Sequence, residues 1–154
     1  YLGKWHQGDF AEWTATNGVV IHGRSDTTLN PGGVRIGTAE IYNIVVSFSE
    51  IRESAVISQE WEGDNRIVLF VIVSESAALD EELKRKIKSS LREQASPRHV
   101  PSLIISVPDL PRTRSGKLSE LAVKAVAEGS SVSNTEALAN PEALDYFVEL
   151  KELQ

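Results

Sequence analysis

The clearest hydrophobic pattern in the first half of the chain is helical. Four apolar residues recur at the spacing i, i+3, i+4 and i+7: Ile41, Ile44, Val45 and Phe48. This spacing places their side chains on one face of a helix, which is typically buried. Thr38 is a suitable N-cap and Glu40 suits the first turn, so the pattern predicts a helix that begins at Ala39.

Three apolar runs predict the strands of one sheet. Residues 67–73 are apolar at every position, which is typical of a central strand covered on both faces. Residues 54–58 form a run before it, and the polar segment 59–66 is expected to join the two strands. The third strand is predicted at residues 103–107, shortly after Pro101.

Three further helices are predicted around and after these strands. Asp80 is expected to cap a helix that runs to Gln94, with three apolar residues on one face: Leu83, Ile87 and Leu91. Residues 118–127 predict a helix that ends near Gly129. Its expected apolar face consists of Leu118, Leu121, Ala122 and Ala125. After a predicted linker at 130–134, Asn140 and Pro141 form a helix start, and the apolar side of that helix is expected to consist of Leu144, Phe147 and Val148.

Short β-prone runs separated by turn residues open the chain. Residues 11–14 and 19–22 flank an Asn-Gly turn, which is a strong hairpin signal. Residues 27–29 and 34–36 flank Asn-Pro-Gly-Gly, which predicts a second turn or hairpin. The sequence therefore predicts an α+β fold, a small three-stranded sheet covered by helices, with a projecting β-hairpin.

Composition narrows the classes of partner. The chain has 154 residues, enough for about one domain, and its net charge of −6 argues against nucleic acid or an anionic membrane as the main partner. It contains no cysteine, which excludes disulfides and cysteine-based metal sites and is typical of a reducing compartment, so we expect a cytoplasmic protein. The three histidines lack ligand spacing, and no Walker, dinucleotide or serine-hydrolase motif occurs.

Residues 111–117, which read Pro-Arg-Thr-Arg-Ser-Gly-Lys, are the strongest candidate for chemistry. Three cations lie in a loop between a predicted strand and a predicted helix, and such loops often carry functional side chains. Gly116 allows a sharp turn, and the Lys117 ammonium is a compact charge suited to an anion. A solvated basic loop would look the same, and four other charged residues beside turns are equally ambiguous singly: Asp9, Arg24, Asp26 and Arg35.

The order of these motifs resembles the C-terminal domain of the acyl-adenylate-forming enzymes. The motifs are Gly-Arg-Ser-Asp at 23–26, Val-Arg-Ile at 34–36, Glu-Ile at 40–41 and the loop 111–117. Gln-Gly-Asp at 7–9 is similar to the end of the family's large N-terminal domain, with Gln7 in place of the usual threonine. Within the superfamily, residues 23–35, 40–45, 96–102 and 139–144 are most similar to the acetoacetyl-CoA synthetases.

The resemblance implies a role for each of eight residues. Lys117 would be the lysine of the adenylation step, and Asp26 would be the hinge about which the small domain turns. Asp9 and Arg24 would hold the ribose of the nucleotide, and Arg35 would contact phosphate. The residues implied for coenzyme A are Gly32, Gly33 and Arg92.

The same resemblance implies an ATP-dependent ligase that joins acetoacetate to coenzyme A, releasing AMP and pyrophosphate. ATP with Mg²⁺ would bind mainly to a large N-terminal domain, and coenzyme A would be the co-substrate. Residues 1–25 would then end that domain and approach the hinge, 26–129 would form the catalytic-lysine domain, and 130–154 a linker and helical extension. Because the sequence starts at Tyr1 amid predicted structure, we expect a fragment that is inactive alone.

Two alternatives stay open at the level of sequence. The domain could belong to an acetyl-CoA synthetase or another short-chain acyl-CoA synthetase, because the acid pocket would lie on the large domain. It could also be a non-catalytic interaction module with the same fold.

If Lys117 acts in adenylation, a lysine acetyltransferase would inactivate it by removing its charge, and a deacetylase would restore that charge.

Overall fold

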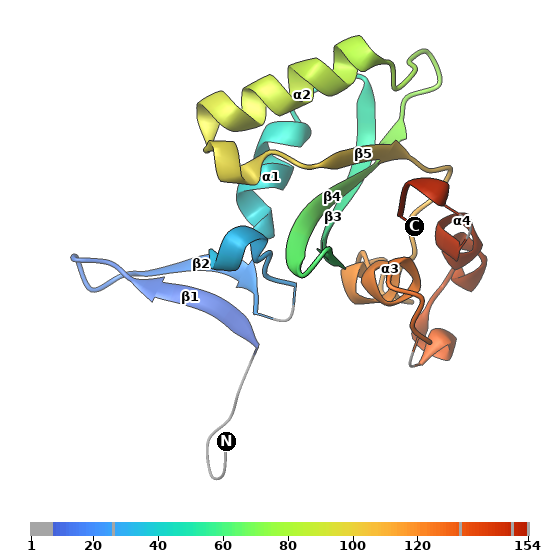
Figure 1. Cartoon of the computed structure of the whole chain (residues 1–154). Helices are drawn as coiled ribbons and strands as arrows, with labels where there is room; N and C mark the ends of the chain where they lie inside the picture. Colours follow the sequence, from blue (N-terminus) through green and yellow to red (C-terminus); the bar gives the residue numbers. More distant parts are fainter. Residues whose placement is uncertain (1–7, 26, 133, 149, 154) are drawn as a thin grey trace.

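The computed structural model describes residues 8–25, 27–132, 134–148 and 150–153, with only the backbone of residues 10 and 22–24. Its elements follow one another along the chain (Figure 1) as β1 (Asp9–Trp13), β2 (Val19–Arg24), η1 (Pro31–Gly33), α1 (Thr38–Val45), β3 (Ile51–Trp61), β4 (Asp64–Val73), α2 (Glu81–Gln94), η2 (Pro97–His99), β5 (Leu103–Ser106), α3 (Glu120–Ala127), η3 (Thr135–Ala137), η4 (Pro141–Leu144), α4 (Asp145–Val148) and η5 (Lys151–Leu153).

A mixed sheet with the strand order β3-β4-β5 forms the centre of the molecule. β3 and β4 are antiparallel, whereas β4 and β5 are parallel and are joined across α2. β4 is the central strand, as its continuous apolar run predicts. The predicted α+β fold, with a three-stranded sheet, covering helices and a projecting hairpin, is confirmed.

Helices cover both faces of this sheet. On one face, Leu69 and Val71 of β4 pack with buried residues of α1 and α2. On the other face, Val68 and Phe70 pack with α3 and with the C-terminal segment, which we define as the described residues between 134 and 153. In Figure 1, α1 and α2 accordingly lie on one side of the sheet, and α3 and α4 on the other.

The sheet hairpin differs from the prediction in length. β3 and β4 extend through most of the polar segment 59–66, leaving Glu62 and Gly63 as the turn, both with positive φ. Gln59 is buried in β3 because its side-chain amide donates to the carbonyl oxygens of Ala127 (3.3 Å) and Leu153 (3.0 Å). A polar residue with buried partners therefore continues a strand where its polarity had suggested a loop.

The N-terminal hairpin is confirmed, but the second predicted hairpin is much reduced. β1 and β2 pair antiparallel and turn near Asn17, which has φ 60°. Around Asn-Pro-Gly-Gly the only regular pairing within the described residues is one bridge, between Leu29 and Ile36, beside the short helix η1. Pro31 at the first helical position favours such a helical turn.

Three details of the helix predictions were wrong. α1 begins at Thr38, with Gly37 as its N-cap, so Thr38 is a buried helical residue rather than the cap. α3 begins at Glu120 and buries Ala122 and Val123, whereas Leu121 is 48% exposed. The last predicted helix is split into η4 and α4. There Leu144 and Phe147 are buried as expected, but Val148 is 59% exposed.

Candidate functional site

The loop that carries Lys117 is a tight turn held by its own backbone. The Thr113 amide donates to the carbonyl oxygen of Lys117 (2.8 Å), and the Gly116 amide donates to that of Thr113 (2.8 Å). The Thr113 hydroxyl also accepts a hydrogen bond from the Lys117 amide (3.1 Å). Gly116 has φ 81°, a left-handed conformation that favours glycine, so the sequence itself permits this turn.

The Lys117 side chain is exposed at the tip of this turn. Within the described parts of the chain, its ammonium group makes no hydrogen bond or ion pair, although its backbone is fixed on both sides. A fixed backbone with an unengaged cation is suited to an anionic ligand brought from outside.

Arg112 braces the turn through its guanidinium group. One nitrogen donates to the carbonyl oxygen of Gly116 (3.1 Å), and another forms an ion pair with Glu53 of β3. Both side chains of this pair are about one-third exposed. Arg112 thus connects the turn to the central sheet, and the planar fork of an arginine allows both contacts at once.

The C-terminal segment lies along the other side of the loop. The amide of Ala139 donates to the carbonyl oxygen of Arg112 (2.8 Å), and the amide of Arg114 donates to that of Ala137 (3.1 Å). The Asn140 side chain accepts a hydrogen bond from the Arg112 amide (2.8 Å). Two backbone hydrogen bonds and one side-chain hydrogen bond therefore join the loop to residues 137–140.

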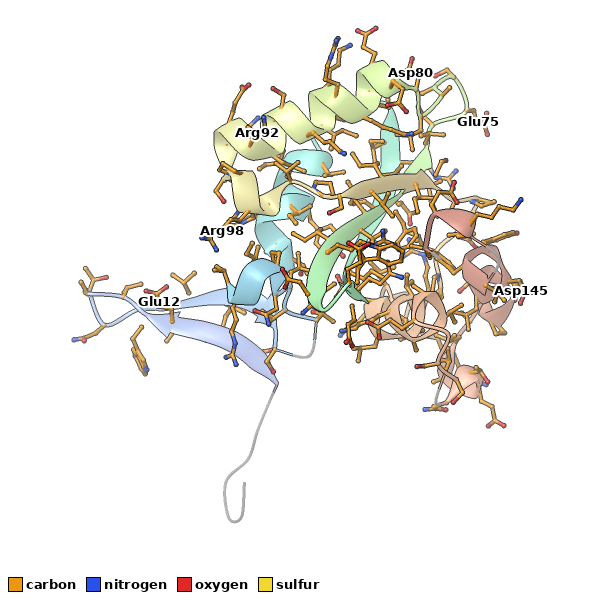
Figure 2. All side chains as sticks on the ribbon, in the orientation of Figure 1. Glu12, Glu75, Asp80, Arg92, Arg98 and Asp145 are labelled. Atoms are coloured by element: carbon orange, nitrogen blue, oxygen red, sulfur yellow. The ribbon has the colours of Figure 1, made fainter. Side chains whose placement is uncertain are left out.

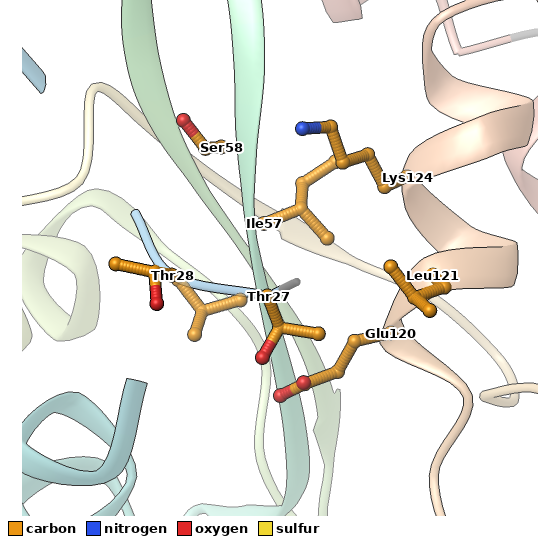
Figure 3. A pocket seen from close by; sticks show the side chains of 8 residues that line it. Thr27, Thr28, Ile57, Ser58, Glu120, Leu121 and Lys124 are labelled. Carbon is orange, nitrogen blue, oxygen red and sulfur yellow. The ribbon is translucent and has the colours of Figure 1, made fainter. Parts of the chain in front are cut away.

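A half-buried pair fixes the start of α3, just after the loop. The Tyr42 hydroxyl of α1 donates to Glu120 and accepts a hydrogen bond from the Val56 amide (3.0 Å). Burial, together with the Glu120 carboxylate, raises the pKa of Tyr42 well above its ordinary value. Beside this pair is a cavity of about 10 Å³, no larger than a water molecule needs, and Figure 3 shows Thr27 and Glu120 among the side chains that line it.

Two of the residues predicted to bind the nucleotide lie opposite one another. Asp9 and Arg24 are paired in the β1–β2 register, at the end of the hairpin nearest the sheet domain. Next to them, the amide of Ser25 donates to the carbonyl oxygen of Gly8 (2.7 Å). The predicted hinge, Asp26, lies outside the described residues. The hairpin therefore positions this pair immediately before the predicted hinge.

The predicted coenzyme A glycines lie on an open turn. Gly32 and Gly33 have φ values of 57° and 76°, and apart from each glycine and its chain neighbours no described atom lies within 4 Å of where a Cβ would be. Arg35, two residues later, lines a hollow of about 300 Å³ together with Arg98 and His99. Glu12 and Glu40 line the same hollow, so its wall carries charges of both signs.

The last predicted site residue, Arg92, lies elsewhere. It is on α2 and lines a second hollow, of about 340 Å³, with Lys84, Arg85 and Lys88. Figure 2 shows Arg92 on the outer side of α2. The structure thus pairs Asp9 with Arg24, whereas Arg35 follows the two glycines only along the chain, and Lys117 and Arg92 lie on separate elements.

Sequence reasoning missed the residues that hold the loop. Glu53, Asn140, Tyr42 and Glu120 gave no signal, because each meets its partner across 28 to 78 residues of sequence. Asn140 was recognised only as a helix start.

Among the described residues there is no cluster of three or more histidines and carboxylates that could hold a metal ion. None of the described helices has the length and apolar character of a membrane-spanning helix.

The chain is similar to known proteins in both sequence and fold. The chain is 61% identical to the acetoacetyl-coenzyme A synthetase of Rhizobium meliloti (strain 1021) over 97% of its length, and 44% identical to the acetoacetyl-CoA synthetase of Xenopus tropicalis over 100%. Its fold matches that of the acetoacetyl-CoA synthetase from Streptomyces lividans with a TM-score of 0.85, at 41% identity over 95% of this chain.

The chain spans 22–23% of the length of these relatives, so the match concerns one part of each of them. The family described as AMP-binding enzyme C-terminal domain matches residues 40–117, just over half of the chain, and the match ends at Lys117. The predicted family is therefore confirmed, and the chain belongs to the AMP-binding enzyme C-terminal domains.

Proposed function

We propose that this chain is the C-terminal part of an ATP-dependent acetoacetate–CoA ligase. The enzyme would convert acetoacetate, ATP and coenzyme A into acetoacetyl-CoA, AMP and pyrophosphate. The observation that carries the proposal is the exposed Lys117 ammonium, which no described residue engages, on a braced turn at the end of the family match. The identity to acetoacetyl-CoA synthetases over nearly the whole chain supports acetoacetate as the acid.

Lys117 would act in the first half-reaction. A carboxylate oxygen of acetoacetate attacks the α-phosphorus of ATP, the bond to the β-phosphate oxygen breaks, and pyrophosphate leaves. The Lys117 ammonium would donate hydrogen bonds to oxygens of the carboxylate and the α-phosphate, where negative charge is concentrated. Because the turn fixes its backbone beforehand, little reorganisation is needed at the moment of reaction.

The other predicted residues would divide between the two half-reactions. Asp9 and Arg24 would hold the ribose, and Arg35 would contact phosphate with its planar donor fork. Asp26 would be the hinge that turns residues 26–129 for thioester formation, with 1–25 joined to the large N-terminal domain and 130–154 as the extension. Transfer of the acyl group from AMP to the coenzyme A thiol would then bring the pantetheine past Gly32 and Gly33, with Arg92 contacting a phosphate of coenzyme A.

Three further predictions depend on this proposal. Mg²⁺ would accompany ATP on the large domain, and the enzyme would be cytoplasmic. An acetyltransferase that modifies Lys117 would abolish its contact with the oxyanion, because acetylation removes the charge. The exposure of the side chain supports access for such an enzyme.

The test is acetoacetate-dependent release of pyrophosphate by the full-length enzyme that carries this chain. Lys117→Ala is expected to lower the rate roughly 100- to 1,000-fold, the loss typical of one pre-oriented oxyanion donor. Lys86→Ala, on the exposed face of α2, is the matched control and should leave the rate unchanged. Full activity in Lys117→Ala would remove this lysine from the mechanism, and a preference for acetate or propionate in a substrate panel would correct the acid.

A further inference from the structure

The side-chain amide of Asn140 is fully engaged with the chain that leads into the Lys117 loop. Its Oδ1 accepts a hydrogen bond from the Arg112 amide (2.8 Å). Its Nδ2 donates to Oδ2 of Asp109 (2.7 Å) and to the carbonyl oxygen of Leu110 (3.0 Å). Asp109 is itself fixed, because its Oδ1 accepts from the Leu110 amide (2.8 Å). One side chain therefore holds three of the four positions from 109 to 112, which lie about 30 residues before it in the sequence.

Helix capping does not explain this side chain. Asn140 is the N-cap of η4, a position where asparagine commonly accepts a hydrogen bond from its own helix. Here no such bond is formed with η4, whose residues are all described. The amide is directed entirely at residues 109–112, in a half-buried setting where unmade hydrogen bonds are costly.

The backbone on either side repeats the connection. The Ala139 amide donates to the carbonyl oxygen of Arg112 (2.8 Å), so both main-chain groups of Arg112 bind the C-terminal segment. Thr113 forms a β-bridge with Leu138. The backbone of Arg112 is consequently held on the C-terminal side, in a defined position relative to Asn140.

The connection continues from Arg112 to the lysine. The Arg112 guanidinium group donates to the carbonyl oxygen of Gly116, the residue before Lys117, and also pairs with Glu53 of the sheet. A shift of the Arg112 backbone would therefore move or break the contact that supports the lysine. The Asn140 side chain thus holds the Arg112 backbone, this backbone positions the Arg112 guanidinium group, and the guanidinium group holds the turn.

We propose that Asn140 is a positioning residue for the adenylation half-reaction, acting on Lys117 through Arg112. The inference rests on the proposed function, because it assigns the C-terminal segment a role in holding that lysine. Displacing a reacting group by about 1 Å can cost on the order of 100-fold in rate, so one lost contact has a measurable effect. Thioester formation, in which Lys117 has no assigned part, should not depend on Asn140.

The experiment compares the two half-reactions in the full-length enzyme. Asn140→Ala is expected to slow acetoacetate-dependent pyrophosphate release by about 10- to 100-fold. Conversion of supplied acetoacetyl-AMP to acetoacetyl-CoA should stay within about twofold of the unmodified enzyme. Phe147→Leu is the control, because it weakens the same segment at its core contact with Phe70 without touching the loop. It should affect the two half-reactions equally.

Asp109→Ala removes the carboxylate that accepts a hydrogen bond from the Asn140 side chain, and it leaves residues 137–140 unchanged. It should slow adenylation in the same selective way, and the double variant with Asn140→Ala should be no slower than the more affected single variant. Asp109→Ala also keeps the proposal testable if Asn140→Ala does not fold. Amide hydrogen exchange at Arg112 gives an independent readout, because Asn140→Ala removes its acceptor and should accelerate exchange there.

Separate outcomes overturn the two proposals. Equal loss in both half-reactions, or unchanged adenylation in a folded Asn140→Ala or Asp109→Ala variant, would refute the positioning role while Lys117→Ala remained inactive. Full adenylation by Lys117→Ala would refute the proposed function of the lysine, whatever the Asn140 variants do.

Discussion

At the scale of single residues, the Tyr42 hydroxyl connects three elements of the domain. Its hydroxyl accepts from the Val56 amide of β3 and donates to Glu120 at the start of α3. Helix α1, the sheet and helix α3 therefore meet at one oxygen atom. Because burial and the adjacent carboxylate raise its pKa, this hydroxyl stays protonated and keeps its donor at high pH.

Tyr42→Phe removes that oxygen and leaves the Val56 amide without its hydrogen-bond acceptor. We expect the free energy of unfolding to fall by about 1–3 kcal/mol at neutral pH, the cost of a buried polar group left unpaired. Chemical denaturation of the two proteins measures the difference. Tyr146→Phe, on the 42% exposed Tyr146, is the control and should change the free energy by less than about 0.5 kcal/mol.

The same variant has a defined dependence on pH. In the unfolded chain Tyr42 loses its proton near its ordinary pKa of about 10, whereas in the folded protein it keeps it. The unfolded state then binds fewer protons, so this tyrosine's contribution to stability declines as the pH rises above about 10. The deficit of Tyr42→Phe should shrink over that range. A deficit that does not change with pH would show that Tyr42 ionises alike in both states.

At the scale of elements, α2 shows how local chemistry sets a boundary. Asp80 accepts a hydrogen bond from the Leu83 amide (2.8 Å), which satisfies one of the free donors at the helix start. Asp80→Ala should lower the free energy of unfolding by about 1 kcal/mol. Thermal or chemical denaturation measures this loss, and Glu75→Ala in the preceding exposed loop is the matched control. Equal stability of Asp80→Ala and the unmodified protein would contradict the capping role.

Elements with a local signal could be predicted from the sequence. The cap of α2, the periodic apolar face of α1 and the continuous apolar run of β4 are each written in neighbouring residues. Gln59 and Leu121 were assigned wrongly because distant residues determine their surroundings. Gln59 is buried through carbonyl groups about 70 and 90 residues away, whereas Leu121 stays 48% exposed although its spacing predicted a covered face.

The candidate site divides in the same way. Lys117, Arg35 and Asp9 could be chosen as candidates because ordered motifs surround them in the sequence. The contacts of Asn140, Glu53 and Glu120 could not, because hydrogen bonds between distant side chains leave no periodic or composition signal. Candidate residues for the chemistry could therefore be chosen from the sequence, whereas the residues that hold the loop could be found only from the fold.

At the scale of the whole molecule, the C-terminal segment completes the hydrophobic core. Phe147 is 1% exposed, and its ring meets that of Phe70 edge to face at 5.0 Å between centroids. Arg66 and Gln59 of the sheet also donate to the carbonyl oxygens of Glu152 and Leu153. The segment is thus part of the domain core, rather than an appendage joined only through its linker.

Phe147→Ala should therefore lower the free energy of unfolding by about 3–5 kcal/mol, the usual cost of deleting a buried aromatic ring. Val148→Ala in the same short helix is the control, because Val148 is 59% exposed and its loss should cost less than about 0.5 kcal/mol. Urea denaturation distinguishes the two variants. Similar small losses in both would show that the C-terminal segment is not a stable part of the core.

The position of Phe147 also sets a sequence of events during protein synthesis. Phe70 is made first, and the ring that covers it is made 77 residues later, after the Lys117 loop. A ribosome adds about 5–20 residues per second, so a growing chain exposes one face of its sheet for several seconds. During that interval it also lacks residues 137–140, which flank the loop. A chain that stalls between residues 117 and 137 would thus contain the lysine but present Phe70 to proteases and chaperones, so loss of the segment would mark defective products for removal.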